Sequence, residues 1–304
     1  MDLIWLQDFL ALIEHGGFSR AAENRSVSQP SFSRRIKSLE EWVGAPLIDR
    51  RTHRIGLTAA GESFRLVAEE TLRRLQLGRE AAQSAAKNDH ETLRFASTHA
   101  LSLTFFPNWL RRLETEKPVE STIALTADHM VACEQLMIAG KAQFLLCHHH
   151  EAAATRLRSD FKSVQLGVDR LLPVAAPSLL DRMDPKDAPQ LAFTAESGMG
   201  RILASAWERD NFQLPSQPVF SSHLANVLTT MAREGRGVAW TALSLVQEDL
   251  EAGRLKRAGP EDADVEIEIR IWRPNARQSP AAEVLWSRIL NDTRNDKSPS
   301  PHSL

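Results

Sequence analysis

The stretch Ser26–Gly44, SVSQPSFSRRIKSLEEWVG, decides the fold of the first part of the chain. Ser28 is a good helix N-cap, Pro30 fits the first turn and Gly44 is a typical C-cap, so a helix is predicted between them. Its buried face carries the apolar residues at helical spacing, Phe32, Ile36, Leu39 and Val43. Its first two turns carry polar and cationic groups on Gln29, Ser31, Ser33, Arg34 and Arg35. Cations at a helix N-terminus cost about 0.3–1 kcal/mol against the macrodipole, so a negatively charged partner is expected there.

The flanking residues predict a winged helix-turn-helix around this segment. Apolar residues from Leu3 to Ile13 predict a first helix, and Ser19 is placed to cap a short second one. Leu47–Ile48 and Ile55–Leu57 flank a basic turn and predict a hairpin. In this layout the N-terminal turn of the third helix enters the major groove of DNA.

The side chains of this turn suit base and phosphate contacts, because Gln pairs with adenine, Arg with guanine, and Ser with a base or a phosphate. The candidate DNA-binding residues of the helix are Ser28, Gln29, Pro30, Ser31, Ser33, Arg34 and Arg35. The hairpin adds three arginines for phosphates or the minor groove, namely Arg50, Arg51 and Arg54. The alternative is an ordinary solvated face on a small helical domain.

Phe9–Gly61 resembles the N-terminal domain of LysR-type transcriptional regulators. The resemblance is carried by Phe18-Ser19, Ala21-Ala22, Ser28-Gln29-Pro30, Ser33-Arg34, Ile36, Leu39-Glu40, Gly44, Leu47, Arg50, Leu57-Thr58 and Gly61. Arg233–Leu255 is more loosely similar to a segment of the family's effector domain. The resemblance implies a DNA operator as partner, homodimers or homotetramers, a small effector that changes DNA geometry or RNA polymerase contact, and base contacts from Gln29, Pro30, Ser31 and Arg34.

The totals exclude several classes of protein. The 304 residues have a net charge of −2, so the basic excess between Arg20 and Arg54 is local and points to an anionic partner for one domain only. No apolar run is long enough to span a membrane, and the N-terminus lacks the basic region of a signal peptide. Two cysteines without a C-x-x-C motif are typical of a reducing compartment, so a cytoplasmic protein is expected. The chain shows no P-loop, G-x-S-x-G or H-E-x-x-H motif, so neither an enzyme nor a cofactor is expected.

The chain is expected to be α/β and multidomain. Residues 1–60 form the winged helix-turn-helix, and 58–90 form a helix of about 45 Å that is too long to bury itself on so small a domain and therefore pairs with another chain. From Thr92 short apolar strands alternate with helices, and the resemblance implies that residues 91–295 form a two-lobed effector domain like a periplasmic binding protein. Residues 296–304 are expected to be disordered. Helices are predicted at Leu103–Glu116, Met130–Ala139, Gly200–Asn211, Leu224–Glu234 and Ala281–Asn291, and strands at 92–97, 121–126, 142–147, 171–176, 190–194, 238–241 and 265–272.

Three stretches have the character of ligand-binding loops at helix N-termini, which favour anions. They are STHALS from Ser97, ESGMGRI from Glu196 and SSHLAN from Ser221. A small anionic or polar effector is therefore predicted, and the candidate contacts are Thr98, His99, Ser102, His148, Met199, Arg201, Ser222, His223 and Thr241. The alternative is ordinary Ser and His capping without a ligand.

Two other kinds of site are weighed. Cys147–Glu151, CHHHE, offers metal-ligand types, but consecutive residues of an extended segment point to alternate faces, so a polar loop at the cleft mouth is favoured over a metal site. Oxidant sensing is the second alternative, because HALSLTFFP and SGMGRI resemble the hypochlorite-responsive branch of the family. Met199 matches a methionine of that pattern, whereas His223 stands where a methionine is expected. A thiol switch between Cys133 and Cys147 has no support from their spacing.

Overall fold

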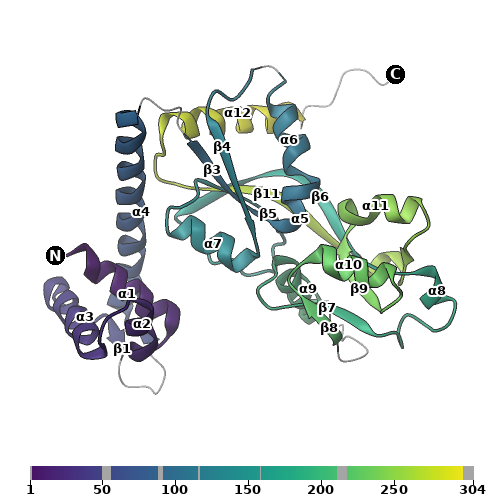
Figure 1. Cartoon of the computed structure of the whole chain (residues 1–304), viewed down its shortest axis with the longest axis horizontal. Helices are drawn as coiled ribbons and strands as arrows, with labels where there is room; N and C mark the ends of the chain where they lie inside the picture. Colours follow the sequence, from purple (N-terminus) through teal and green to yellow (C-terminus); the bar gives the residue numbers. More distant parts are fainter. Residues whose placement is uncertain are drawn as a thin grey trace. The chain divides into compact units, whose positions relative to one another are not determined.

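The computed structural model describes residues 2–49, 56–87, 92–115, 117–157, 159–210 and 218–296. The chain divides into two compact units, residues 1–87 with 138–141, and residues 88–137 with 142–304. Each unit is shown in Figure 1. Within the described ranges no helix combines the length and the apolar character that crossing a bilayer requires.

The first unit contains the predicted helices and hairpin. Its elements are α1 (Leu3–His15), α2 (Phe18–Asn24), α3 (Gln29–Val43), β1 (Ile48–Asp49), β2 (Gly56–Leu57) and α4 (Ala59–Lys87). The strands pair antiparallel, with Ile48 opposite Leu57. One prediction was wrong: Gly17, not Ser19, is the N-cap of α2, so Ser19 lies inside the helix.

Helix α3 is fixed by the residues that its spacing selects. Phe32, Ile36 and Leu39 are fully buried against residues of α1 and α2, and Gly44 ends the helix with a left-handed φ of 79°. Ser28 occupies the N-cap position, but its hydroxyl bonds to Ser31 Oγ at 2.9 Å instead of to a backbone N–H. The backbone N–H groups in the first turn of α3 therefore receive no capping hydrogen bond from the Ser28 side chain.

Helix α4 begins at Ala59 and is capped as predicted by Thr58, whose Oγ1 accepts a hydrogen bond from the Gly61 N–H at 2.9 Å. It runs for 29 residues to Lys87, about 44 Å at 1.5 Å per residue. Val67 and Leu75 are 57% and 51% exposed on it. This exposed apolar surface is what a helix that pairs with a second chain would present.

The second unit is built on one mixed sheet with helices on its faces. In spatial order the main strands are β4 (Thr122–Asp128), β3 (Thr92–Thr98), β5 (Phe144–His149), β11 (Val265–Pro274), β6 (Phe161–Ala175), β9 (Val238–Ala242), β7 (Gln190–Phe193) and β8 (Pro218–Ser222), and β10 (Lys256–Arg257) pairs with β6. The helices are α5 (His99–Thr104), α6 (Phe106–Leu113), α7 (Met130–Ile138), α8 (Pro177–Leu180), α9 (Gly198–Asp210), α10 (Ala225–Arg233), α11 (Leu243–Glu251) and α12 (Pro280–Asp296), with a 3₁₀ turn at Glu261–Ala263.

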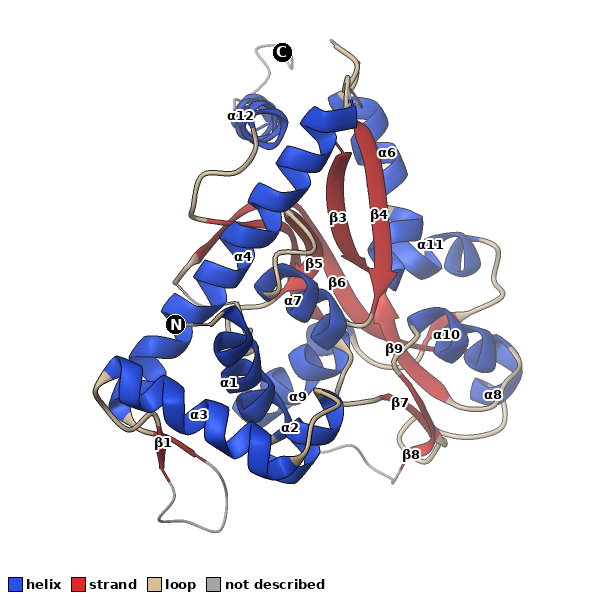
Figure 2. Ribbon diagram, turned by 60° about the vertical axis from the view of Figure 1, so that its left-hand side comes forward, coloured by secondary structure: helices blue, strands red, loops and turns tan. Residues whose placement is uncertain are grey.

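The sheet has two parallel ends joined by an antiparallel ribbon. β3 pairs parallel with β4 and β5 in a first lobe, and β7 pairs parallel with β8 and β9 in a second lobe. β11 and β6 run antiparallel between the lobes, with a register shift between Ile269 and Arg270. Figure 2 shows β6 running between the two groups of strands. The alternation predicted for Val265–Trp272 is confirmed, because Ile267, Ile269 and Ile271 are buried.

Each lobe has its own apolar core. Phe95, Trp109, Phe144 and Trp286 pack in the first lobe, and Leu172, Leu228 and Val246 pack in the second. Two predictions were wrong in extent. The helix expected at Leu103–Glu116 is two helices that meet at Phe105, because Pro107 fits only the first turn of a new helix. β6 begins ten residues before the predicted strand, since polar residues interrupt its apolar pattern.

Candidate DNA interface and effector cavity

The N-terminal turn of α3 is accessible for contact with a partner. Ser28, Gln29, Pro30 and Arg34 are exposed, and Ser31 and Ser33 are partly exposed. The buried side chains of α3 hold the opposite face. The structure thus brings six of the seven candidate residues of this helix onto one accessible end.

Arg35, the seventh, is committed to a buried carboxylate. Its Nη1 lies 3.2 Å from Asp8 Oδ2, and Arg25 Nε donates to Asp8 Oδ1 at 2.8 Å. Asp8 is fully buried, so removing either arginine leaves part of a desolvated charge uncompensated. Arg35 therefore ties α3 to α1. Sequence reasoning missed Asp8, although its place next to Phe9 and four residues before Leu12 puts it on the buried face of the first helix.

The hairpin arginines Arg50, Arg51 and Arg54 lie outside the described residues. The strands that flank them are described, with Asp49 opposite Gly56 in an antiparallel pair. The role of these arginines stays a prediction.

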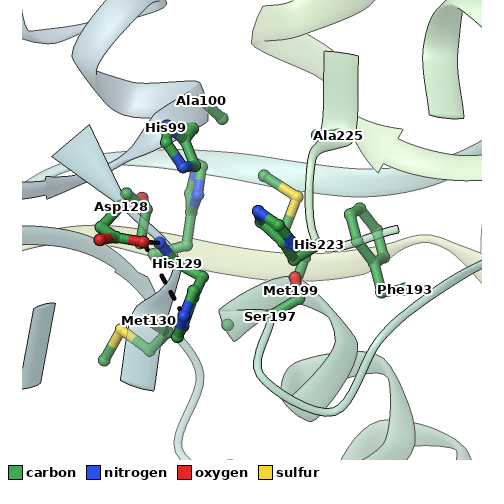
Figure 3. A pocket seen from close by; sticks show the side chains of 13 residues that line it. His99, Ala100, Asp128, His129, Met130, Phe193, Ser197, Met199, His223 and Ala225 are labelled. Atoms are coloured by element: carbon green, nitrogen blue, oxygen red, sulfur yellow. Dashed lines mark hydrogen bonds and ion pairs between the residues drawn. The ribbon is translucent and has the colours of Figure 1, made fainter. Parts of the chain in front are cut away.

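A small cavity of about 30 Å³ lies in the second unit, where the ends of strands meet the N-termini of helices. It is lined by Thr98, His99, Ala100, Asp128, His129, Met130, His148, Phe193, Ser197, Gly198, Met199, His223 and Ala225. Figure 3 shows side chains from both lobes directed toward it. The structure thus brings together five of the predicted effector contacts, Thr98, His99, His148, Met199 and His223.

Three imidazoles gather at this cavity. The ring centroid of His223 lies 6.0 Å from that of His99 and 5.5 Å from that of His129. Each histidine comes from a different connection, at the start of α5, before α7 and before α10. Burial lowers the pKa of His99 below its ordinary value; the Asp128 carboxylate opposes this shift, and the His223 and His129 imidazoles add to it. His99 is thus neutral near pH 7 when the cavity holds no anion.

The hydrogen bonds of His129 fix its tautomer. The Ala132 N–H donates to His129 Nδ1 at 3.3 Å, so the proton of the neutral ring is on Nε2. Nε2 lies 3.8 Å from Asp128 Oδ1, and that same oxygen accepts a hydrogen bond from the His129 N–H at 2.7 Å. His129 Nδ1 is therefore occupied as an acceptor, and its Nε2 lies next to the Asp128 carboxylate. Sequence reasoning missed Asp128 and His129, although ADHM stands between a predicted strand and a predicted helix, as the other loops do.

Two buried polar atoms beside the cavity have no hydrogen-bond partner in the described part of the chain. They are Thr98 Oγ1 and His148 Nε2. His148 is 5% exposed, and its Nε2 lies 3.6 Å from Asp169 Oδ2, beyond hydrogen-bond distance. His148 Nε2 is thus turned toward Asp169. Because an unsatisfied buried polar group costs about 1–3 kcal/mol, the Thr98 hydroxyl indicates a site that a polar ligand or water completes.

Arg201 lies elsewhere. Its guanidinium holds Glu134 through two hydrogen bonds, of 3.1 Å from Nη1 and 3.0 Å from Nη2. Glu134 is fully buried and also accepts from Thr155 Oγ1 and from the Arg156 N–H. Arg201 lines a separate cavity of about 20 Å³ next to Cys147. Its charge is thus engaged by a carboxylate.

Three further candidates are not among the residues that line the first cavity. Ser102 Oγ donates to the His99 carbonyl at 2.8 Å, and Ser222 Oγ accepts from the Leu224 N–H at 3.1 Å. Thr241 is fully buried, with its hydroxyl 3.4 Å from that of Thr229. Their bonds are those of ordinary capping and packing groups.

The histidine run and Cys147 line the second cavity together, namely Cys147, His148, His149 and His150. His148 also lines the first cavity, whereas the His149 ring packs at 5.6 Å from Trp272. No group of three or more His, Cys, Asp or Glu among the described residues is arranged to hold a metal ion. Burial raises the pKa of Cys133 to about 12 and raises that of Cys147 as well. Neither thiol is ionised near pH 7, which disfavours a thiol switch.

Two family models match the chain. The model of the bacterial regulatory helix-turn-helix protein, lysR family, matches residues 3–62, and the LysR substrate binding domain matches residues 86–294. The chain belongs to the LysR family of transcriptional regulators. The family assignment and the fold expected from Phe9–Gly61 are therefore confirmed, and the chain is a regulator and not an enzyme.

Several LysR proteins resemble it over most of their length. The HTH-type transcriptional regulator YjiE of Escherichia coli is 27% identical over 289 residues, covering 94% of this chain and 93% of YjiE. The full-length structure of HypT from Salmonella typhimurium, described as a hypochlorite-specific regulator, has a TM-score of 0.58 and 27% identity, covering 97% of this chain and 99% of HypT. DarR of Vibrio fischeri in complex with DNA has a TM-score of 0.55 and 29% identity, covering 96% and 99%.

These likenesses agree with the two units of this LysR regulator. Members of the family bind DNA and small-molecule effectors and form oligomers. The exposed turn of α3 belongs to the matched helix-turn-helix range, and the three-histidine cavity belongs to the matched substrate binding domain.

Proposed function

We propose that this LysR regulator reads its operator with the N-terminal turn of α3 and is controlled by a small anionic or polar effector in the cavity between Thr98, His99, His129 and His223. The observation that carries the second half is the unsatisfied Thr98 hydroxyl, buried beside three imidazoles. A ligand oxygen or halide there would accept hydrogen bonds from these groups, of which the Thr98 hydroxyl has no hydrogen-bond partner among the described residues.

On the DNA side, Gln29, Ser31 and Arg34 would meet base edges while Arg35 holds α3 in place. Pairing of two chains through α4 would give a homodimer, and two such pairs a homotetramer. The regulator would act in the cytoplasm, and the effector would change the contact with RNA polymerase at the promoter. A chain that ends after Ser84 tests the pairing: it should sediment as a dimer, and a monomer would exclude α4 as the dimerising element.

The effector half is tested with the Thr98→Val variant. Valine keeps the shape of threonine and removes the orphaned hydroxyl, so the unliganded variant should be at least as stable as the wild type. An operator fragment is first selected in vitro with the full chain. Fluorescence anisotropy then follows how small acids change operator binding by each protein. Loss of the response with unchanged DNA affinity supports the cavity, and an unchanged response excludes Thr98 from the effector site.

Oxidant sensing is a second candidate because Met199 is buried in the wall of the same cavity. HypT, described as hypochlorite-specific, is 27% identical to this chain. A thioether there could be oxidised to a sulfoxide, which is polar and would disturb the apolar wall. Mass spectrometry after mild hypochlorite treatment separates the two: preferential oxidation of Met199 with altered operator binding favours sensing, and oxidation of exposed Met183 alone removes it.

A further inference from the structure

We propose that the cavity takes a small monoanion together with one proton, carried by the His99–His223 pair, so that the regulator's effector response is coupled to pH. This inference rests on the proposed role of the cavity as the effector site. It adds the size class of the ligand, its charge and the source of the neutralising positive charge.

The enclosed part of the cavity has room for a few heavy atoms. Its volume of about 30 Å³ exceeds what one water needs, roughly 10–15 Å³, by a factor of only two to three. The walls next to the imidazoles are apolar and come from Ala100, Met130, Phe193, Met199 and Ala225. A halide, nitrite or formate fits this enclosed space, whereas an aromatic acid or an amino acid would extend past the exposed His223 toward solvent.

An anion in such a site needs a positive charge, because apolar walls do not replace its hydration. No lysine or arginine is among the residues that line the described cavity. Arg201, the arginine that the sequence predicted as an effector contact, donates from both Nη atoms to Glu134. Among the side chains that line the described cavity, only the imidazoles can supply a full positive charge, and they acquire it only by taking up a proton.

The surrounding groups select which imidazole takes the proton. His129 Nδ1 accepts the Ala132 N–H, so protonating that nitrogen would break the bond and oppose two hydrogens. His148 is buried on β5 with its Nε2 directed toward Asp169. His99 and His223 remain, with centroids 6.0 Å apart on opposite sides of the cavity. His223 is exposed and can exchange a proton with solvent.

The electrostatics of the pair change sign when an anion enters. In the unliganded cavity, burial and the imidazoles of His223 and His129 keep the pKa of His99 low, against the effect of Asp128. The exposed Glu196 interacts with His129 and His223 from the second lobe. A monoanion between the rings stabilises the protonated form, so the pKa of His99 rises on binding. The dissociation constant is therefore lowest at acid pH and rises up to tenfold per pH unit between the free and bound pKa values.

Isothermal titration calorimetry of the full chain tests the coupling. Sodium bromide, nitrite and formate are titrated between pH 6 and 8 at constant ionic strength, balanced with gluconate, which is too large for the cavity. Two buffers of different ionisation enthalpy report the protons taken up. We expect uptake that approaches one proton per anion and weaker binding at higher pH.

Variants assign the proton to the pair. The double variant His99→Gln, His223→Gln keeps side-chain donors but cannot be protonated, so it should lose most of the affinity and all of the proton uptake. His223→Lys carries a charge that does not titrate in this range, so it should bind without proton uptake and without a change between pH 6 and 8. His15→Gln, in α1 of the first unit, is the matched control and should behave as the wild type. Circular dichroism confirms that each variant is folded.

The outcomes separate this inference from the proposed function. Anion binding without proton uptake, or uptake that persists in the double variant, overturns the coupling and leaves the effector cavity standing. If larger organic acids bind and change operator affinity while the three small anions do not, the size class is wrong and the effector site still stands. If no acid of any size binds, both proposals fail.

Discussion

Two buried carboxylates, Asp8 in the first unit and Glu134 in the second, are each held by arginine, but they leave different charges at the neighbouring binding surface. Asp8 binds Arg25 and Arg35, and Arg34 stays exposed on the same turn of α3. Glu134 accepts hydrogen bonds from both Nη atoms of Arg201, and the cavity that we propose for the effector is lined by imidazoles and by no arginine or lysine.

This difference matches the partners that we propose for the two surfaces. DNA carries its negative charge at every physiological pH, and a permanent guanidinium suits it. The concentration of an effector varies, and an imidazole, which can gain or lose its charge, suits a site whose occupancy must change with conditions. The first two tests below each change one side of this comparison, and the third changes another arginine–carboxylate pair of the second unit.

The largest expected effect follows from removing Arg201. Arg201→Ala leaves the buried Glu134 with one cation, the exposed Arg156 guanidinium, whose Nε lies 3.9 Å from Glu134 Oε2, so the free energy of unfolding should fall by about 3 kcal/mol. Urea denaturation of the full chain, followed by tryptophan fluorescence, measures it, because Trp109, Trp207, Trp240, Trp272 and Trp286 all lie in the second unit. The control Arg201→Met with Glu134→Leu removes both charges and should recover most of the loss. A single variant as stable as the wild type would show that the Thr155 hydroxyl, the Arg156 N–H and the Arg156 guanidinium suffice for Glu134.

An intermediate effect is expected on the DNA side, where Arg34 and Arg35 are neighbours with different roles. Arg34→Ala should weaken binding to the selected operator by about 1–3 kcal/mol more than binding to shuffled DNA. Arg35→Ala should lower the thermal midpoint of unfolding in addition to weakening DNA binding, because Asp8 loses one of its two arginines. Fluorescence anisotropy and thermal unfolding measure the two quantities. Equal losses on both DNAs for Arg34→Ala would make it a phosphate contact.

The smallest effect concerns a third pair, Arg273 and Glu283, which tests whether such a pair can itself depend on pH. Hydrogen bonds from Arg273 lower the pKa of Glu283 to about 2. The folded state thus binds the proton more weakly than the unfolded chain, so the stabilisation is complete above the ordinary pKa of 4.5 and is lost as the pH falls toward 2. The difference in thermal midpoint between wild type and Glu283→Gln should be clear at pH 6 and shrink toward pH 3. A constant difference would assign the effect to packing.

The sequence predicted α3 well and the effector cavity only in part, for a physical reason. The anchors of α3, Phe32, Ile36 and Leu39, lie on one helix, where periodicity alone determines which face is buried. The cavity takes residues from several connections, and its membership depends on how strands pair across the sheet. The strand-end rule therefore found His99, Met199 and His223 but missed His129.

Ion pairs between residues that are far apart in the sequence could not be predicted from local sequence patterns. Glu134 stands 67 residues before Arg201, and nothing around either residue indicates that they meet. Asp8 and Arg35 are separated in the same way by 27 residues. A local motif thus identifies a cation, whereas only the fold determines whether its charge is free to meet a ligand.

The register shift in the β6–β11 ribbon has a mechanical consequence. The two lobes are joined by these two strands. The regular pairing of β11 with β6 is interrupted where Ile269 and Arg270 lie opposite Gly167 and Gln165. Gly167 has no side chain to resist torsion at that point. We expect the ribbon to twist there at low energetic cost, so that the two lobes can rotate as rigid bodies about this part of the ribbon. A small change in the volume around the three imidazoles would then rotate one lobe relative to the other. Such a rotation gives its largest displacement at the ends of the lobes that are farthest from the ribbon.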